Sequence, residues 1–177
     1  GGTRRNSYIL SLQPTASTSS LCGGATPCIE PIAGNAFLQK TLSGSFLVKN
    51  KYLEQLLEVK GKNTEETWKS IIAAKGSVQH LSCLTDVEKA VFRTAYEMNM
   101  REIVQQAADR QPFICQAQSL NVFFTTPVSG KYLHETHFMA WKLGVKSLYY
   151  MRSAAPIEAD RIDMKIEKRD LANEECA

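Results

Sequence analysis

The feature that most constrains the fold of this chain is a pair of apolar stretches, each as long as a β-strand. A stretch as long as a helix separates them. Ser119–Phe124 (SLNVFF) and Lys146–Met151 (KSLYYM) are rich in aromatic and branched side chains and predict β-strands. Tyr132–Leu143 lies between them and predicts a helix that ends at Gly144. Because strands joined by a helical crossover of this length run parallel, the sequence predicts an α/β fold at its C-terminal end.

The N-terminal part predicts a strand, a long loop and a short irregular region. Asn6–Gln13 (NSYILSLQ) predicts a strand that ends at Pro14, because proline has no amide to donate to a sheet. Dense turn residues then predict a loop as far as Asn35. We expect short irregular or hairpin structure at 36–50 (AFLQKTLSGSFLVKN).

The middle of the chain predicts helices. These are Leu53–Lys60, Glu65–Lys75 and Thr85–Asp109. Asn63 and Glu66 have the spacing of a capping pair for the second helix. Thr85 and Glu88 form a T-x-x-E capping box at the start of the third, whose apolar spacing slips once near Asn99.

Composition and charge limit the class of protein. The 177 residues are 44% hydrophobic and 22% charged, which is typical of one globular domain. The net charge is +3 and the basic residues are scattered, so the sequence predicts no nucleic-acid partner. No apolar run approaches the roughly 18 residues that span a bilayer, and residues 1–5 (GGTRR) lack the apolar core of a signal peptide. We expect a cytoplasmic protein with no membrane partner.

The residues from Pro156 onward differ from the rest of the chain. They alternate in charge, contain no aromatic residue and end in NEECA. Such a segment cannot bury enough apolar surface to offset the entropy lost on ordering. The sequence therefore predicts a folded part at 1–155 and a flexible charged C-terminal tail at 156–177.

The cysteines and histidines lack the spacing of a metal site. Five cysteines are an odd number in a chain large enough to bury a core, so we expect free thiols. The cysteine pairs lack C-x-x-C spacing, and His134 with His137 falls one residue short of H-E-x-x-H. We predict no bound metal.

A run of small hydroxyl residues follows the predicted N-terminal strand. The run contains Thr15, Ser17, Thr18, Ser19 and Ser20. Successive amides and short hydroxyls at the end of a strand can converge on an anion such as phosphate. The same residues are also common in turns and helix caps, and the run lacks the G-x-x-x-x-G-K-[ST] pattern. Both interpretations stay open on composition alone.

Tyr149 and Tyr150 are adjacent in a predicted strand, where regular pleating places neighbours on opposite faces. In one interpretation the two aromatic side chains serve only for packing. They can also be a redox relay, because a phenol loses an electron and a proton together and can pass the hole to a second phenol nearby. A relay requires a twist or bulge that brings the two rings into a stack.

Three ordered pieces of the sequence resemble one known family. The pieces are NSYILSLQPTASTSS, ADRQPFICQAQSLNVFF and WKLGVKSLYYMR. In order and spacing they resemble the C-terminal part of the large (alpha), catalytic subunit of class I ribonucleotide reductase, from about Asn6 to Ala155. The resemblance implies that this chain is the C-terminal portion of that family's ten-stranded α/β barrel, most of which is absent here.

The resemblance implies roles for two sites. In that family the loop binds the diphosphate of the substrate nucleotide, and the matching residues are Pro14, Thr15, Ala16, Ser17 and Thr18. The family's radical-transfer tyrosines match YY of GVKSLYYMR, which disfavours the adenosylcobalamin-dependent relatives. The radical comes from a small (beta) subunit with a di-metal tyrosyl-radical type of cofactor, so this chain is expected to bind no cofactor directly.

The resemblance also implies what the chain lacks. The family's thiyl-radical cysteine, reducing cysteine pair and catalytic asparagine and glutamate lie upstream, and none of Cys22, Cys28, Cys83 or Cys115 replaces them. The family's tail carries two cysteines that receive electrons from an external thiol reductant such as thioredoxin or glutaredoxin. This tail offers Cys176 alone, as a candidate redox residue or an incidental thiol.

These implications give two expected functions. In the first, the chain completes the catalytic subunit of a ribonucleoside-diphosphate reductase, with the N-terminal part of the large subunit and the small subunit as partners. That enzyme reduces ribonucleoside diphosphates to 2′-deoxyribonucleoside diphosphates by radical chemistry. In the second, the chain is a non-catalytic phosphate-binding or scaffold fragment left by an interrupted reductase gene.

Overall fold

The computed structural model describes residues 5–23, 26–41 and 44–154. The predicted tail at 156–177, with Cys176, lies outside the described residues. The helices, strands and short 3-10 turns (η) are α1 (Ala16–Leu21), β1 (Ala36–Thr41), β2 (Gly44–Lys49), α2 (Lys51–Val59), α3 (Glu65–Ala73), α4 (Asp86–Val91), η1 (Ala95–Glu97), α5 (Met100–Arg110), η2 (Gln111–Phe113), β3 (Val122–Thr125), α6 (Gly130–Lys142) and β4 (Met151–Ala154). No described helix is long and apolar enough to cross a membrane.

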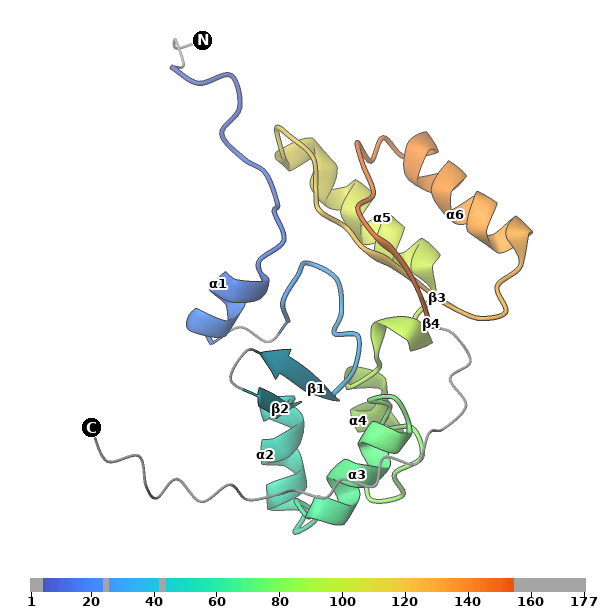
Figure 1. Ribbon diagram of the computed structural model, residues 1–177. Helices are drawn as coiled ribbons and strands as arrows, with labels where there is room; N and C mark the ends of the chain where they lie inside the picture. Colours follow the sequence, from blue (N-terminus) through green and yellow to red (C-terminus); the bar gives the residue numbers. More distant parts are fainter. Residues whose placement is uncertain (1–4, 24–25, 42–43, 155–177) are drawn as a thin grey trace, which may run out of the picture.

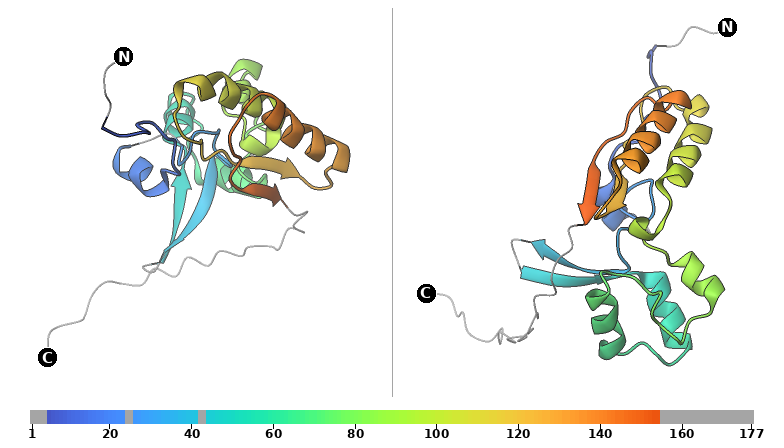
Figure 2. Two further views of the ribbon diagram at one scale, coloured as in Figure 1. Left: turned by 90° about the horizontal axis from the view of Figure 1, so that it is seen from above. Right: turned by 90° about the vertical axis from the view of Figure 1, so that its right-hand side faces the viewer.

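The elements gather around two separate hydrophobic clusters. Figure 1 and the right-hand view of Figure 2 show α5, α6 and the β3–β4 pair in one group, and the β1–β2 hairpin with α2 and α3 in the other. The strand cluster is centred on Leu120 and β3 and takes Met100, Ile103, Val104 and Ala107 from one face of α5. The hairpin cluster consists of Ala36, Leu53, Leu57, Trp68, Ile71, Val78 and Leu84.

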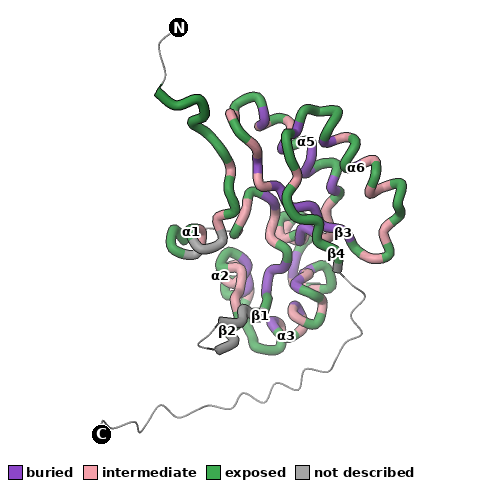
Figure 3. The backbone as a smooth tube through the Cα atoms, turned by 45° about the horizontal axis from the view of Figure 1, so that its top comes forward, coloured by how far each residue is buried: buried purple, intermediate pink, exposed green. Residues whose placement is uncertain are grey.

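The C-terminal strand pair has the predicted direction. β3 and β4 are parallel, with Val122 opposite Met151 and Thr125 opposite Ala154, and α6 connects them. In Figure 3 buried residues, coloured purple, lie along β3 and on α5. A parallel strand pair is normally covered on its faces, and here α5 packs against β3. The α/β prediction is confirmed.

The last predicted strand begins later than expected. Regular pairing starts at Met151, whereas the prediction placed the strand at Lys146–Met151. The backbone before it is held irregularly, because the Tyr150 amide donates to the side chain of Asn121 instead of a main-chain carbonyl. α6 begins two residues earlier than predicted, at Gly130, and Gly144 follows its end with a φ of +77°.

The predicted helix at Thr85–Asp109 is wrong as one element. The structure breaks it into α4, η1 and α5. Thr94 starts a new capping box with Glu97, and Asn99 caps α5 by accepting a hydrogen bond from the Arg101 amide. Caps of this kind end one helix and begin another, although the apolar spacing continues across them. The capping box of Thr85 and Glu88 is confirmed.

The hairpin and the two helices of the other group follow the predictions closely. β1 and β2 pair antiparallel, with Ala36 opposite Lys49. The predicted capping pair of α3 is wrong, because Thr64 is its N-cap and accepts from the Thr67 amide. Asn63 instead accepts a hydrogen bond from the indole Nε1 of Trp68 at 2.7 Å, which satisfies the polar end of a buried ring.

The N-terminal segment departs from the predictions in two places. Asn6–Gln13 is not a regular strand, and only Leu12 forms a parallel bridge, with Gln118. Backbone bonds from Leu12 to Ala117 and from Ser119 to Leu12 nevertheless hold it beside the approach to β3. The predicted loop after Pro14 contains α1, because the Thr15 carbonyl accepts the Ser19 amide and closes a helical turn.

Candidate functional site

The tyrosine pair lies directly before β4. The ring centroids of Tyr149 and Tyr150 are 4.2 Å apart and the planes are inclined by 53°. The phenols are therefore close, as a relay requires, but tilted instead of stacked. Each side chain is 52% exposed. The two rings can share one side because regular strand pairing starts only at the next residue.

The two phenols influence each other electrostatically. A hydrogen bond with Tyr150, and the charge that Tyr150 carries when ionised, raise the pKa of Tyr149 above its ordinary value. The guanidinium group of Arg152 lies over the Tyr150 ring, 5.3 Å from its centroid. A tyrosine of ordinary pKa is already protonated at neutral pH, and this shift favours the protonated phenol of Tyr149 further.

The hydroxyl-rich loop forms the start of α1. Thr15 occupies the N-cap position but makes no side-chain capping bond. Its Oγ1 instead donates to the carbonyl of Pro27 at 3.1 Å, and its amide donates to the same carbonyl. The first amides of a helix have no partner within the helix, so an uncapped start leaves donors for an acceptor such as an anion.

A second segment anchors this loop. Ser19 Oγ donates to the carbonyl of Thr26 at 2.6 Å, beside the Thr15 bonds to Pro27. The segment Thr26–Glu30 thus lies against the loop, and its last residue, Glu30, is 5% exposed. The Asn121 side-chain amide donates to the carboxyl group of Glu30. One short segment therefore connects the loop with the strand region that holds the tyrosines.

Sequence reasoning missed Glu30 and Asn121 as members of the site. Asn121 carried a detectable signal, because it is a polar residue inside the otherwise apolar stretch Leu120–Phe124. A buried amide in such a stretch must find hydrogen-bond partners. Glu30 gave no comparable signal, since a glutamate in a turn-rich region is ordinarily solvated.

The Cys28 thiol is unsuited to act as a nucleophile. Burial raises the pKa of this thiol, and the neighbouring carboxyl group of Glu30 raises it further, against weaker opposing contributions from the Thr15 amide and Arg152. Reactive cysteines have lowered pKa values, because the thiolate is the reactive form. Cys28 therefore stays a thiol at neutral pH.

The remaining cysteines and histidines are dispersed. Cys22 and Cys83 form no disulfide. His134 stacks on Phe138, and a ring nitrogen of His137 lies 2.8 Å from the Leu133 carbonyl. Within the described ranges, no group of three His, Cys, Asp or Glu side chains could hold a metal ion.

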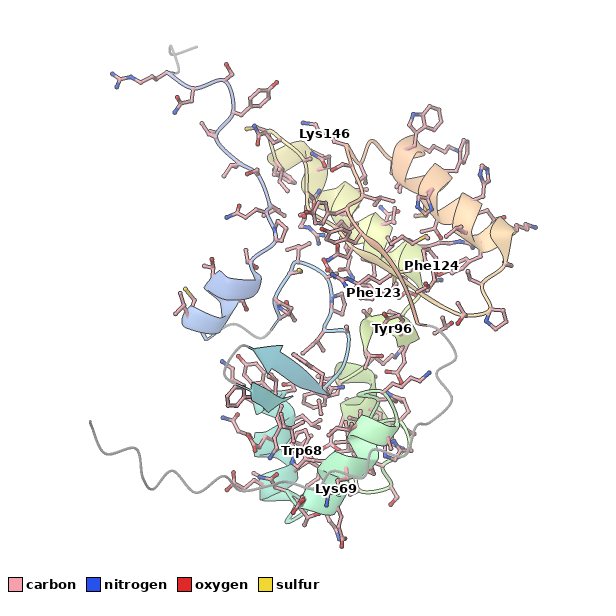
Figure 4. All side chains as sticks on the ribbon, in the orientation of Figure 1. Trp68, Lys69, Tyr96, Phe123, Phe124 and Lys146 are labelled. Carbon is pink, nitrogen blue, oxygen red and sulfur yellow. The ribbon has the colours of Figure 1, made fainter. Side chains whose placement is uncertain are left out.

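A cavity of about 260 Å³ opens at the C-terminal end of β3. Its walls include Tyr96, Phe123 and Phe124, which Figure 4 labels, and Tyr96 meets the Phe123 ring edge-on. The other lining residues are Met98, Thr125, Pro127, Val128, Ser129 and Tyr132. This lining carries no charged side chain, so its chemistry differs from that of an anion site.

The parallel strands and the helix that connects them define an α/β fold. Comparison with known proteins identifies the family. A model of the family described as "Ribonucleotide reductase, barrel domain" matches residues 2–151. The chain belongs to this family.

Individual relatives support the same assignment. The large subunit of ribonucleoside-diphosphate reductase from invertebrate iridescent virus 6 is 43% identical over 92% of this chain, and the subunit from invertebrate iridescent virus 3 is 41% identical over 92%. The solved alpha subunit of the class Id ribonucleotide reductase of Actinobacillus ureae matches 86% of this chain with a TM-score of 0.76 and 41% identity.

The matches cover only part of each relative. The chain spans 17% and 26% of the two viral subunits and 27% of the Actinobacillus chain. It therefore corresponds to a fragment of the large subunit and to a part of the barrel, as the resemblance implied.

Proposed function

We propose that this chain completes the large, catalytic subunit of a ribonucleoside-diphosphate reductase and supplies its substrate-phosphate loop and its radical-transfer tyrosines. The enzyme reduces ribonucleoside diphosphates to 2′-deoxyribonucleoside diphosphates, the precursors for DNA replication. It is active only with the upstream part of the large subunit and with the small subunit. The observation that carries the proposal is the 4.2 Å separation of the Tyr149 and Tyr150 rings.

The tyrosine pair passes a radical by exchange of a hydrogen atom. The O–H bond of one phenol breaks while an O–H bond forms on the phenoxyl radical of the other, and one electron moves with the proton. A phenol of ordinary pKa is protonated at neutral pH, and Tyr150 raises the pKa of Tyr149 further, so an electron leaves Tyr149 together with the proton. The small subunit, with a di-metal tyrosyl-radical type of cofactor, generates the radical, and this chain binds no cofactor directly.

The loop binds the substrate diphosphate through its backbone. Residues Pro14, Thr15, Ala16, Ser17 and Thr18 form the entry to α1. Thr15 turns its hydroxyl to Pro27 and leaves the first amides of the helix without a side-chain cap. These amides point toward the same end of the helix and suit an anionic group.

The tail completes the catalytic cycle by bringing in reducing equivalents. In this role the Cys176 thiolate attacks the disulfide formed by the reducing cysteine pair of the upstream part, which releases one thiol of that pair and leaves a mixed disulfide. An external dithiol reductant such as thioredoxin or glutaredoxin then cleaves the mixed disulfide, and its own two thiols become a disulfide. Exchange of this kind requires a thiol that the reductant can reach.

Phenylalanine substitutions of the two tyrosines test the proposal. Tyr149→Phe and Tyr150→Phe keep ring and volume but remove the phenolic proton, so the assembled enzyme should bind substrate normally and lose turnover. Reductase activity and nucleotide affinity are measured on the same samples. Near wild-type turnover in either variant excludes that tyrosine from an obligatory radical path. Reconstitution of the wild-type chain with the upstream polypeptide and the small subunit tests the alternative, because a non-catalytic scaffold fragment gives no reductase activity.

A further inference from the structure

A buried polar network joins the segment after α1 to the tyrosine pair. Glu30 and Asn121 are 5% and 4% exposed. Asn121 Nδ2 donates to Glu30 Oε1 and lies 3.7 Å from Cys28 Sγ. On the other side of the amide, Asn121 Oδ1 accepts the backbone N–H of Tyr150 at 3.2 Å. The Asn121 side chain therefore uses both its donor and its acceptor end.

Glu30 determines which way this amide faces. Both carboxyl oxygens of Glu30 accept from Asn121, Oε1 from the side-chain Nδ2 and Oε2 from the backbone amide at 3.5 Å, which leaves Oδ1 facing the Tyr150 N–H. The reversed amide would set oxygen against carboxylate and N–H against N–H. Unmatched polar groups are costly in a buried site, so the observed orientation is strongly preferred.

The Asn121 bond replaces a main-chain bond at the point where the tyrosines lie. Tyr149 donates its amide to the Leu120 carbonyl at 2.8 Å, and the Tyr150 carbonyl accepts the Val122 amide at 2.9 Å. Between these two bonds the Tyr150 amide binds a side chain. The backbone is consequently irregular here, and neighbouring rings share a side instead of pointing to opposite faces.

We propose, on the basis of the function proposed above, that Glu30 and Asn121 are positioning residues for radical transfer between Tyr149 and Tyr150. Glu30 orients the Asn121 amide, and Asn121 fixes the backbone of Tyr150 so that its ring stays against Tyr149. Neither residue exchanges a proton or an electron in this role. Because misplacing reacting groups by about 1 Å can slow a reaction about 100-fold, loss of this support should appear in kcat.

The proposal is tested by exchanging the carboxyl group of Glu30 and the amide group of Asn121, because these substitutions leave the side-chain volumes nearly unchanged. Asn121→Asp places a second carboxyl group against Glu30 and should lower kcat about 10-fold or more, with the KM for the ribonucleoside diphosphate within about threefold of wild type. The double variant E30Q/N121D restores the pattern, because the introduced glutamine can donate to the introduced aspartate, which still accepts from Tyr150. It should recover kcat to within about threefold of wild type.

One further variant tests Glu30 itself, and another serves as a control at a distant site. Glu30→Gln alone removes the acceptor-only group that orients the Asn121 amide and should lower kcat, although less than Asn121→Asp, because the glutamine oxygen can still accept from Asn121. Asn35→Asp makes the same chemical change at another fully buried asparagine, which binds the carbonyls of Gly76 and Phe92 in the hairpin group. It should lower thermal stability but leave kcat per assembled enzyme within twofold.

All variants are measured in the complete large subunit assembled with the small subunit, and kcat is normalised to assembled enzyme. A wild-type kcat in Asn121→Asp, or failure of the double variant to recover, overturns the positioning role. Tyr149→Phe and Tyr150→Phe are assayed in parallel. If the phenylalanine variants abolish turnover while Asn121→Asp does not reduce it, only the positioning role is excluded. If the phenylalanine variants keep turnover, the radical path through the two tyrosines is excluded as well.

Discussion

Lys60 Nζ lies 2.8 Å from Glu88 Oε2 and joins the end of α2 to the first turn of α4. The same Nζ donates to the Cys83 carbonyl at 3.0 Å, so the ammonium group ties together the two ends of the segment between these helices. Glu88 also accepts the Thr85 amide as part of the capping box. One carboxyl group thus serves a helix cap and an ion pair.

The Glu88 contacts predict a pH dependence of stability. The hydrogen bond from Lys60, followed by that from the Thr85 amide, lowers the pKa of Glu88 below its ordinary value. Stability from a lowered carboxyl pKa is present above the unfolded value, near pH 4.3, and is lost as pH falls through the folded value. Glu88→Gln should therefore lower the Tm of the complete subunit at pH 7, and the difference from wild type should shrink below about pH 4. A difference that stays constant from pH 7 to pH 3 would contradict the assignment.

Two glycines that follow helices predict different responses to alanine. Gly76 and Gly61 have φ of +84° and +64°, and a left-handed residue with a Cβ costs roughly 1–2 kcal/mol. A Cβ on Gly76 would also lie 2.5 Å from the Cα of Gly34, whereas nothing lies within 4 Å at Gly61. Gly76→Ala should therefore destabilise by about 1–3 kcal/mol more than Gly61→Ala. Urea unfolding of the complete subunit measures both, and equal losses would rule out the close approach.

The sequence predicted the elements whose signals are local. The parallel pair followed from two apolar stretches and a helix of crossover length, and the α4 capping box followed from Thr85 and Glu88. The break before α5 was not predicted, because Thr94 and Asn99 act as caps at positions where the apolar spacing stays helical. A cap and an interior polar residue look alike when only spacing is considered.

The candidate site likewise has one part that the sequence predicted and one part that it did not. The tyrosine pair was visible because its two members are adjacent in sequence. The partnership of Glu30 with Asn121 joins residues 91 positions apart, and no periodicity or motif relates them. Their pairing depends on the fold bringing the segment after α1 against β3, which only the three-dimensional structure shows.

The isolated chain should aggregate or remain poorly ordered. Both sheets in the described part of the chain have two strands, and parallel strands are ordinarily covered by neighbours. Tyr8, Ile9 and Leu10 are 62%, 57% and 53% exposed beside the approach to β3. Size-exclusion chromatography and thermal unfolding of the purified chain measure the outcome. A monomer with a cooperative thermal transition would count against the role as one piece of a divided barrel.

The loop predicts a contrast between removing a hydroxyl and adding bulk. If backbone amides bind the diphosphate, Thr18→Ala removes at most one neutral hydrogen bond, worth about 0.5–1.5 kcal/mol, or roughly twofold to 12-fold in affinity. Ala16→Phe adds a large side chain at the first residue of α1 and should weaken binding more, because it obstructs the approach of the phosphate to the amides. Nucleotide affinity of the assembled enzyme is measured for both variants, with Tyr149→Phe as the control that leaves the loop intact. Unchanged affinity in Ala16→Phe would remove the loop from the substrate site.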